Sequence, residues 1–203
     1  MKFVRKPPTT DKKLSEQLLN SGWQKIWEPR NLAIATLLAL PFAFLSEGLI
    51  VWLAYMLKPE LFNFISSNSL EISLNLDFKL LLFVAAIFVY MLLHELTHAV
   101  FIPGFAKSEK TCWGMNGLFG FVFTTEPIRK GRFLMICVMP FILLSLMPLY
   151  LLSIFHFLNW YTLGLCMINA GGSCVDILNF LLIVLQVKNG QTIVNNGFET
   201  YYK

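Results

Sequence analysis

Charged side chains are scarce in this chain of 203 residues. Aspartate, glutamate, lysine and arginine make up 14% of it, and hydrophobic residues make up 56%. Soluble globular chains carry about 25% charged and roughly 45–50% apolar residues. The composition therefore excludes an ordinary soluble domain. Histidine is rarer still, with three residues in total, so the position of each one is informative.

The cysteines lack the spacing of a structural cluster. Four are present, at positions 112, 137, 166 and 174, and no CxxC pair occurs. Three of them lie in long apolar runs. A disulfide framework or a thiolate zinc cluster is therefore not expected. We interpret these cysteines as small apolar core residues.

The first 30 residues lack the apolar segment of a signal peptide. They are polar and basic, and they include Pro7 and Pro8. Residues 14–27 are expected to form a helix in the membrane interface that ends before Pro29, because apolar side chains share one face with lysines around it. The residues on that face are Leu14, Leu18, Trp23, Ile26 and Trp27.

Four apolar runs dominate the rest of the chain, and each exceeds the roughly 18 residues typical of a membrane span. They cover residues 31–57, 80–103, 133–157 and 160–187. The sequence predicts an all-α membrane protein with four transmembrane helices and short β elements in the loops. Residues 1–30 would be an N-terminal cytoplasmic or interfacial segment, 31–187 the membrane domain and 188–203 a cytoplasmic tail.

Basic residues are concentrated before the first run and between the second and third. The connection between the third and fourth runs carries no charge. Because cytoplasmic loops hold the excess of lysine and arginine, we expect a multi-pass cell-membrane protein with both termini and the 104–132 loop in the cytoplasm. Basic residues dispersed beside apolar runs suit a lipid bilayer better than nucleic acid. The two basic groups are Lys2, Arg5, Lys6, Lys12, Lys13, Lys25 and Arg30, and Lys107, Lys110, Arg129, Lys130 and Arg132.

Two loop segments have the pattern of strands. Residues 70–78 alternate apolar and polar side chains, which predicts a half-buried strand on the side away from the cytoplasm. Residues 112–125 contain three glycines and a run of aromatic and β-branched residues. This second pattern predicts a hairpin or a bulged strand near the cytoplasmic surface.

The second apolar run contains the sequence His94-Glu95-Leu96-Thr97-His98. Residues four apart lie on one face of a helix, so the two imidazoles can bind one metal ion while the glutamate acts as a general base. Ionisable groups inside a membrane span are costly and usually functional. A hydrogen-bonded polar cluster that joins helices is the weaker interpretation.

A catalytic zinc ion usually takes three protein ligands, and the third has to lie at the same membrane depth. A helix rises about 1.5 Å per residue, so His98 and His94 lie roughly 8 and 14 Å from the cytoplasmic end of their run. By the same count Asp176 lies roughly 16 Å deep and Glu47 roughly 24 Å deep. Asp176 is therefore the expected third ligand, and Glu47 is left without an assigned role.

Polar residues accompany Asp176 along the fourth run. Asn169, Ser173 and Asp176 are spaced to form one stripe, with two glycines between them that permit close approach of another helix. Asn169, Ser173 and Asn179 are candidates for contacts with the metal ligands or with substrate. Hydrogen bonds between helices are an equally good interpretation of the asparagines.

The order of these features resembles the site-2 protease superfamily of intramembrane metalloproteases. More specifically, it is similar to a family of small bacterial membrane proteins described as putative zincin peptidases. The similarity covers residues 80–186, and the expected catalytic core is residues 80–187. It lies in His94-Glu-Leu-Thr-His98, Met139-Pro-Phe-Ile-Leu-Leu-Ser145 and Asn169-Ala-Gly-Gly-Ser-Cys-Val-Asp176.

The resemblance implies that His94, His98 and Asp176 bind Zn²⁺, that Glu95 is the catalytic base and that the site lies nearer the cytoplasmic face. Site-2 proteases commonly have glycine directly after the aspartate, where this chain has Ile177. Our first hypothesis is hydrolysis of a membrane protein or peptide substrate. That substrate must be extended, and residues 112–125 would pair with it as an added strand.

Two other functions are weighed against this hypothesis. The alternative is a non-catalytic zinc-binding membrane protein that binds or regulates a membrane partner, and the presence of a base at Glu95 argues against it. A transporter is disfavoured because, apart from Glu47, the polar groups cluster at one depth.

Overall fold

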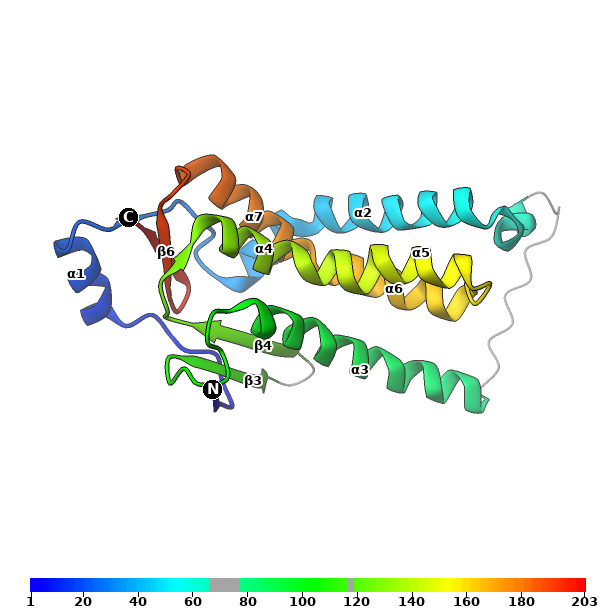
Figure 1. The fold of residues 1–203 in the computed structure, drawn as a ribbon, viewed down its shortest axis with the longest axis horizontal. Helices are drawn as coiled ribbons and strands as arrows, with labels where there is room; N and C mark the ends of the chain where they lie inside the picture. The colour runs from blue at the N-terminus through cyan, green and yellow to red at the C-terminus, as the bar shows by residue number, and fades with distance from the viewer. Residues whose placement is uncertain (66–76, 117–118) are drawn as a thin grey trace.

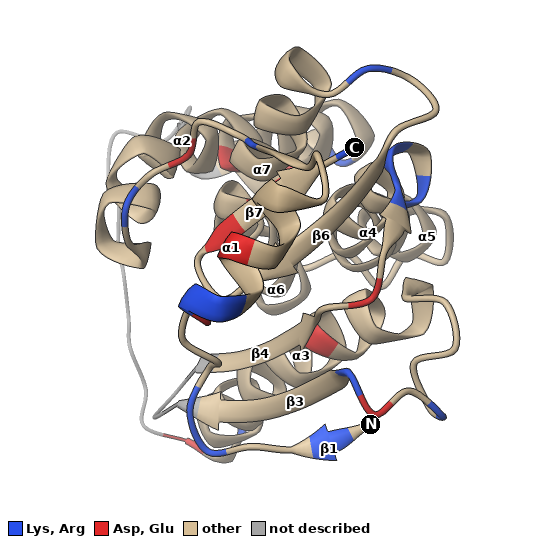
Figure 2. Ribbon diagram, turned by 90° about the vertical axis from the view of Figure 1, so that its left-hand side faces the viewer, with Lys and Arg blue, Asp and Glu red and all other residues tan. Residues whose placement is uncertain are grey.

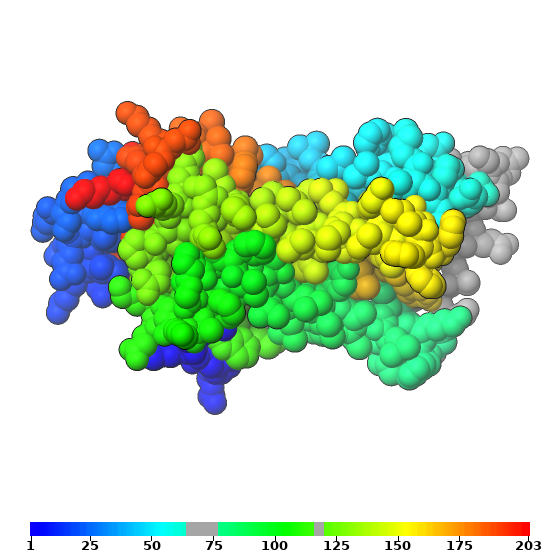
Figure 3. Space-filling model, in the orientation of Figure 1, coloured from blue at the N-terminus to red at the C-terminus, as the bar shows by residue number. Residues whose placement is uncertain are grey.

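The computed structural model describes residues 1–65, 77–116 and 119–203. It is elongated, with long helices side by side and with the strands and both termini gathered at one end (Figure 1). The space-filling view in Figure 3 shows the same elongated outline. We call the end that carries strands β1–β7 the strand end. The opposite end, with the turn at residues 155–159, is the far end.

Three helical stretches are long and apolar enough to cross a membrane. They are α2 (Leu32–Leu57), α3 (Phe78–Phe101) and the run Lys130–Ile154. A fourth is added if the bent pair α6 (Trp160–Gly172) and α7 (Cys174–Gln186) counts as one span. The chain is thus mostly helical, with three or four apolar helices and short strands.

Large apolar side chains cover the outward faces of these helices. Phe44 and Leu45 on α2, Leu81 on α3 and Leu151 in the third stretch are all exposed. Soluble monomers rarely expose contiguous apolar patches beyond a few hundred Å². An apolar surface along whole helices is typical of a protein that contacts lipid.

The third stretch is irregular in its middle. It consists of α4 (Lys130–Phe141), a π-helical segment η2 (Ile142–Leu146) and α5 (Met147–Ile154). Pro140 in α4 has no N–H to donate to the helix. Inside η2, the Ser145 hydroxyl donates to the Cys166 carbonyl of α6 at 2.8 Å. The irregular segment is therefore anchored to the neighbouring helix.

The fourth apolar run is broken in two, which corrects the prediction of a single helix over residues 160–187. Helices α6 and α7 meet at Ser173 with a bend of 41°. The carbonyl of Ala170, close to the break, accepts a hydrogen bond from the Ser46 hydroxyl of α2 at 2.9 Å. A neighbouring helix thus provides a hydrogen-bond donor for a backbone carbonyl near the bend, and backbone groups in apolar surroundings need such partners.

Helix α6 packs against α2, α3 and the α4–η2–α5 stretch. Figure 2 looks along the helices from the strand end. The short 3₁₀ helix η1 (Pro59–Ile65) follows α2 at the far end. The core around α6 is formed by Ile50, Ala54, Leu149, Leu163, Cys166 and Ala170.

A three-stranded sheet lies beside the strand end of α3 (Figure 1). Its order is β1 (Lys2–Phe3), β3 (Thr111–Asn116) and β4 (Phe119–Thr124), with β3 and β4 antiparallel. The hairpin predicted within residues 112–125 is confirmed. A side chain on Gly114 would collide with the Val4 carbonyl, so glycine lets the N-terminal strand approach.

A second, four-stranded sheet joins the two ends of the chain. Its order is β2 (Gln24–Lys25), β7 (Glu199–Tyr202), β6 (Thr192–Asn196) and β5 (Ile128–Arg129), and all pairs are antiparallel. The predicted tail after residue 187 therefore contains a hairpin. Tyr201 of β7 is buried.

The predicted interfacial helix is shorter than expected. Helix α1 (Lys12–Asn20) begins at its N-cap Asp11 and ends before Ser21. The prediction of one helix over residues 14–27 is therefore wrong beyond Asn20, because the following residues pair as β2 with β7. Leu18 of α1 packs on Val194 and Tyr201 of the C-terminal hairpin. The strand predicted at residues 70–78 lies almost entirely outside the described residues.

Candidate metal centre

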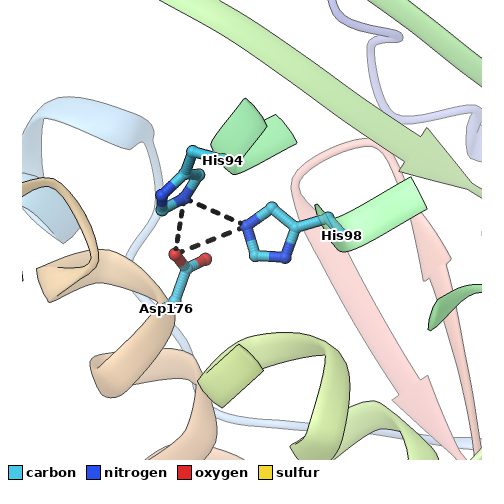
Figure 4. A group of neighbouring side chains, drawn as sticks. All are labelled: His94, His98 and Asp176. Atoms are coloured by element: carbon cyan, nitrogen blue, oxygen red, sulfur yellow. Dashed lines mark hydrogen bonds and ion pairs between the residues drawn. The ribbon is translucent and has the colours of Figure 1, made fainter. Parts of the chain in front are cut away.

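Helix α3 places His94 and His98 one turn apart on one face. Their rings meet edge to face, with centroids 4.9 Å apart, and both side chains point toward α7 (Figure 4). The opposite face of this part of α3 carries Leu92, Leu96 and Val100, which are exposed. The histidines therefore point into the protein, whereas the opposite face of this part of the helix is apolar and exposed.

Asp176 meets them from the first turn of α7. Its Oδ2 atom lies 3.2 Å from His94 Nε2 and 3.4 Å from His98 Nε2. The two Nε2 atoms are 3.2 Å apart. The break at Ser173 lets α7 start beside α3, so three residues that are distant in sequence form one triangle (Figure 4).

The Nδ1 atom of each histidine lies within hydrogen-bond distance of an oxygen atom. His98 Nδ1 lies 2.9 Å from the Ile136 carbonyl, which can only accept, so Nδ1 carries the proton. His94 Nδ1 lies 3.0 Å from Asn169 Oδ1. In both rings the neutral tautomer then leaves the Nε2 lone pair facing the triangle.

Asn169 is itself fixed by two further contacts. Its Nδ2 donates to the Pro140 carbonyl at 3.0 Å and to the Ser145 hydroxyl at 2.8 Å. A carbonyl accepts only, so the amide nitrogen must face Pro140 and the amide oxygen must face His94. The π-helical segment η2 thus orients a histidine of the triangle through one asparagine.

The donor set fits zinc. Two imidazole nitrogens and one carboxylate oxygen converge with lone pairs facing inward, an arrangement that a cation stabilises. Tetrahedral zinc at about 2.0–2.2 Å from its ligands places neighbouring ligand atoms roughly 3.3–3.6 Å apart. The three separations of 3.2, 3.2 and 3.4 Å are close to that spacing.

Glu95 lies beside the triangle and against strand β4. A side chain on Gly120 would place its Cβ 2.6 Å from Glu95 Cγ. A cavity of about 280 Å³ opens here, and Glu95 and His94 form part of its wall with Tyr90, Met91 and Ile168. The cavity wall is mainly apolar, so this side of the centre suits an apolar ligand.

A second cavity, of about 130 Å³, reaches the centre from the strand end. His98 and Asp176 line it together with Val122 of β4, Asn179 of α7 and Asn195 of β6. The metal centre therefore lies between an apolar cavity at the level of the helices and a more polar one toward the strands.

The residues singled out from the sequence fall into three groups. His94, His98 and Asp176 come together, and Glu95 lies next to them. Asn169 contacts His94, and Asn179 lines the second cavity. Ser173, a candidate for the same roles, is fully buried, and its hydroxyl donates to the Asn169 carbonyl at 2.9 Å. It therefore stabilises the end of α6 and contacts neither cavity.

Three residues of the site were missed from the sequence. Ser145 lay in a segment that was interpreted as a helix, and Gly120 lay in the segment that was expected to pair with the substrate, but neither residue was given a role of its own. Asn195 lay in the tail. Only the stretch around Ser145 carried a signal, through the family resemblance.

The four cysteines are all buried and free. None belongs to the group of side chains that could hold a metal ion in the described part of the chain. Their expected role as small core residues is confirmed for Cys166, which packs in the core around α6.

The chain matches the family described as putative zincin peptidase over residues 87–192, just over half of its length. The chain belongs to this family. The matched stretch contains all three residues of the triangle as well as Glu95, and it ends at Thr192. Most of the C-terminal hairpin lies beyond it. No curated protein and no solved structure matches the chain.

Proposed function

We propose that this protein is an intramembrane zinc metallopeptidase that hydrolyses peptide bonds of membrane-associated or membrane-spanning substrates. The observation that carries the proposal is the convergence of two imidazole lone pairs and one carboxylate, with Glu95 beside them, on helices whose outer faces are apolar. The similarity to site-2 proteases in motif order supports it.

His94, His98 and Asp176 would hold the zinc ion. Zinc, when bound, acts as a Lewis acid that polarises a scissile carbonyl and makes water easier to deprotonate. Glu95 would take the proton from the attacking water and donate it to the leaving amine. Glu95 lines the apolar cavity, and the proposal puts the substrate in this cavity.

Strand β4 offers a way to hold the substrate extended. Among the described residues it is one of the two edge strands of its sheet. Gly120 lines the apolar cavity, and Val122 and Thr124 line the polar one. A peptide that pairs with β4 would therefore run past the centre from one cavity to the other, with main-chain hydrogen bonds supplying affinity.

The alternative function, a zinc site that only binds or regulates a partner, has less support. A structural zinc site is normally closed by four protein ligands. In the described part of the chain the metal-ligating group contains three residues. A glutamate directly beside an open coordination position is typical of zinc sites that catalyse hydrolysis.

The test is zinc content together with cleavage by the full-length protein in lipid nanodiscs. We expect about one zinc per chain in the wild type and in Glu95→Gln, and loss of zinc in His94→Ala. Cleavage of membrane-spanning test peptides should fall roughly 10²–10⁴-fold in Glu95→Gln, because a general base contributes about that factor. The control Glu16→Gln makes the same change at an exposed position of α1. Full cleavage by Glu95→Gln, or a wild type without zinc, would refute the proposal.

A further inference from the structure

A third cavity lies next to the polar cavity of the metal centre. Its volume is about 190 Å³, and its polar wall residues include Glu28, Asn179, Asn195 and Thr200. A single water takes roughly 30 Å³ in the liquid, so the cavity has room for a side chain. We call it the Glu28 pocket. It joins the segment before α2, helix α7 and the C-terminal hairpin.

The Glu28 pocket adjoins the metal centre. It shares Phe133, Asn179 and Asn195 with the polar cavity that His98 and Asp176 line. Along α7 the pocket extends to Ile183, seven residues or about 10 Å beyond Asp176. An extended peptide covers that distance in about three residues at 3.3 Å each. A side chain two or three residues from the scissile bond therefore reaches the pocket.

The carboxylate of Glu28 has no ion-pair partner among the described residues. Its Oε1 accepts the Thr200 backbone N–H at 2.7 Å. The neighbouring Lys25 is engaged elsewhere, since its Nζ lies 2.6 Å from Glu199 Oε1. Burial raises the pKa of Glu28 to about 7. The pocket thus holds a half-buried acid that accepts a hydrogen bond from Thr200 but forms no ion pair among the described residues, and a cation entering the pocket would stabilise its charged form.

A membrane-spanning substrate supplies such a cation. Lysine and arginine are enriched directly after membrane spans on the cytoplasmic side. The strand end carries the basic segments of this chain, so it is the end we expect in the cytoplasm. The residues of a substrate that leave the membrane at this end are therefore the ones richest in positive charge.

We propose that the Glu28 pocket is a subsite for a lysine or arginine side chain of the substrate, two or three residues from the scissile bond on its cytoplasmic side. This inference rests on the proposed peptidase function and adds a substrate class to it. Glu28 selects membrane segments with a basic residue close to the cut. Asn179 and Asn195, on the shared wall, lie where the peptide between the two sites passes.

The test uses full-length Glu95→Gln protein in nanodiscs, so that substrate is bound and not cut. The probe is a synthetic peptide with a leucine–alanine span of about 20 residues and a serine–glycine tail that carries one lysine at successive positions. A carbodiimide activates a carboxylate and joins it to an amine without a spacer, so coupling is favoured for a lysine held against that carboxylate, and mass spectrometry locates the bond. We expect coupling to Glu28 to peak at one lysine position.

Binding affinity gives a second readout. Replacing the lysine at that position by norleucine should weaken binding about fivefold to tenfold, as expected for a partly buried ion pair. The same replacement should have no effect when Glu28→Gln is added to the protein. Glu16→Gln, the matched control, should behave like the parent. Coupling spread over exposed carboxylates, or an equal norleucine effect with and without Glu28, would overturn the inference.

Cleavage by the protein with an intact Glu95 separates the two proposals. If it cuts the peptides equally well at every lysine position, the subsite is wrong and the peptidase function stands. If Glu28 couples at one position and no peptide is cut, the pocket binds basic segments and the peptidase function is wrong.

Discussion

At the scale of single residues, the metal centre depends on groups that do not themselves face the ion site. Asn169 decides the tautomer of His94, and the Ile136 carbonyl decides that of His98. Such partners of metal-bound histidines usually tune affinity strongly. Asn169 is the more informative of the two, because it is a side chain and can be replaced.

We predict that Asn169→Leu lowers zinc affinity roughly 10- to 100-fold, because His94 loses the acceptor that keeps its Nε2 lone pair toward the site. Competition with a chelator measures the effect. Ser145→Ala removes one acceptor of the Asn169 amide and leaves the bond between Asn169 and His94. The loss of zinc affinity in this variant should therefore be smaller. Thr36→Val is the control, since the Thr36 hydroxyl bonds only within its own helix. Equal affinities for Asn169→Leu and wild type would contradict this role.

At the scale of elements, local patterns were predictable and long-range pairings were not. The histidine spacing and the hairpin of β3 and β4 depend on neighbouring residues, so the sequence contains them. Asp176 could be predicted as a ligand because the rise per helical residue gives the membrane depth of each position from its place in the sequence. The pairing of Gln24 with Tyr202 is different, since it joins residues at opposite ends of the chain and leaves no periodic signal in either. The pairing of this sheet brings Asn195 to the site, so the position of Asn195 there could not be predicted from the sequence.

The break between α6 and α7 was also unpredictable, for a physical reason. No proline lies at Ser173, and the two preceding glycines indicated only close approach of a helix. In the structure Gly171 does meet α2, at the carboxylate of Glu47. The bend is stabilised by tertiary contacts, such as the one from Ser46 to the Ala170 carbonyl.

The two glycines before the break make a matched pair for a test at this scale. An alanine at 171 would collide with Glu47, whereas one at 172 meets no atom within 4 Å. We predict that Gly171→Ala destabilises the protein by about 0.5–1.5 kcal/mol, the cost of moving a side chain off its rotamer, because the end of the Glu47 side chain has to shift. Gly172→Ala should be neutral or slightly stabilising, because alanine favours a helix over glycine by up to about 1 kcal/mol.

Thermal unfolding in detergent compares these glycine variants. Adding Glu47→Ala to Gly171→Ala should recover most of the lost stability, because the smaller side chain removes the collision. Equal melting temperatures for the two single variants would show that Glu47 does not restrict residue 171. A double variant no more stable than Gly171→Ala would place the strain elsewhere in the helix.

At the scale of the whole molecule, charge separates the two ends. Lysine and arginine positions gather on the elements nearest the viewer in Figure 2, at the strand end. At the far end the Lys58 ammonium donates to the Leu158 carbonyl at 2.8 Å, so this basic group stabilises the turn before α6. The asymmetry, together with the apolar helices between the ends, favours a membrane protein with the strand end in the cytoplasm.

Both termini lie at the strand end (Figure 1), so one fusion after Lys203 tests the orientation of the whole molecule. We predict that a reporter active only in the cytoplasm works when fused there and fails when inserted between Phe157 and Leu158 at the far end. A reporter active only outside the cytoplasm should give the reverse pattern, which controls for expression. If the Lys203 fusion is active outside, the metal centre lies nearer the outer face. Glu28 would then meet the flank of a substrate that is poor in lysine and arginine, and the basic-residue preference would lose its physical basis.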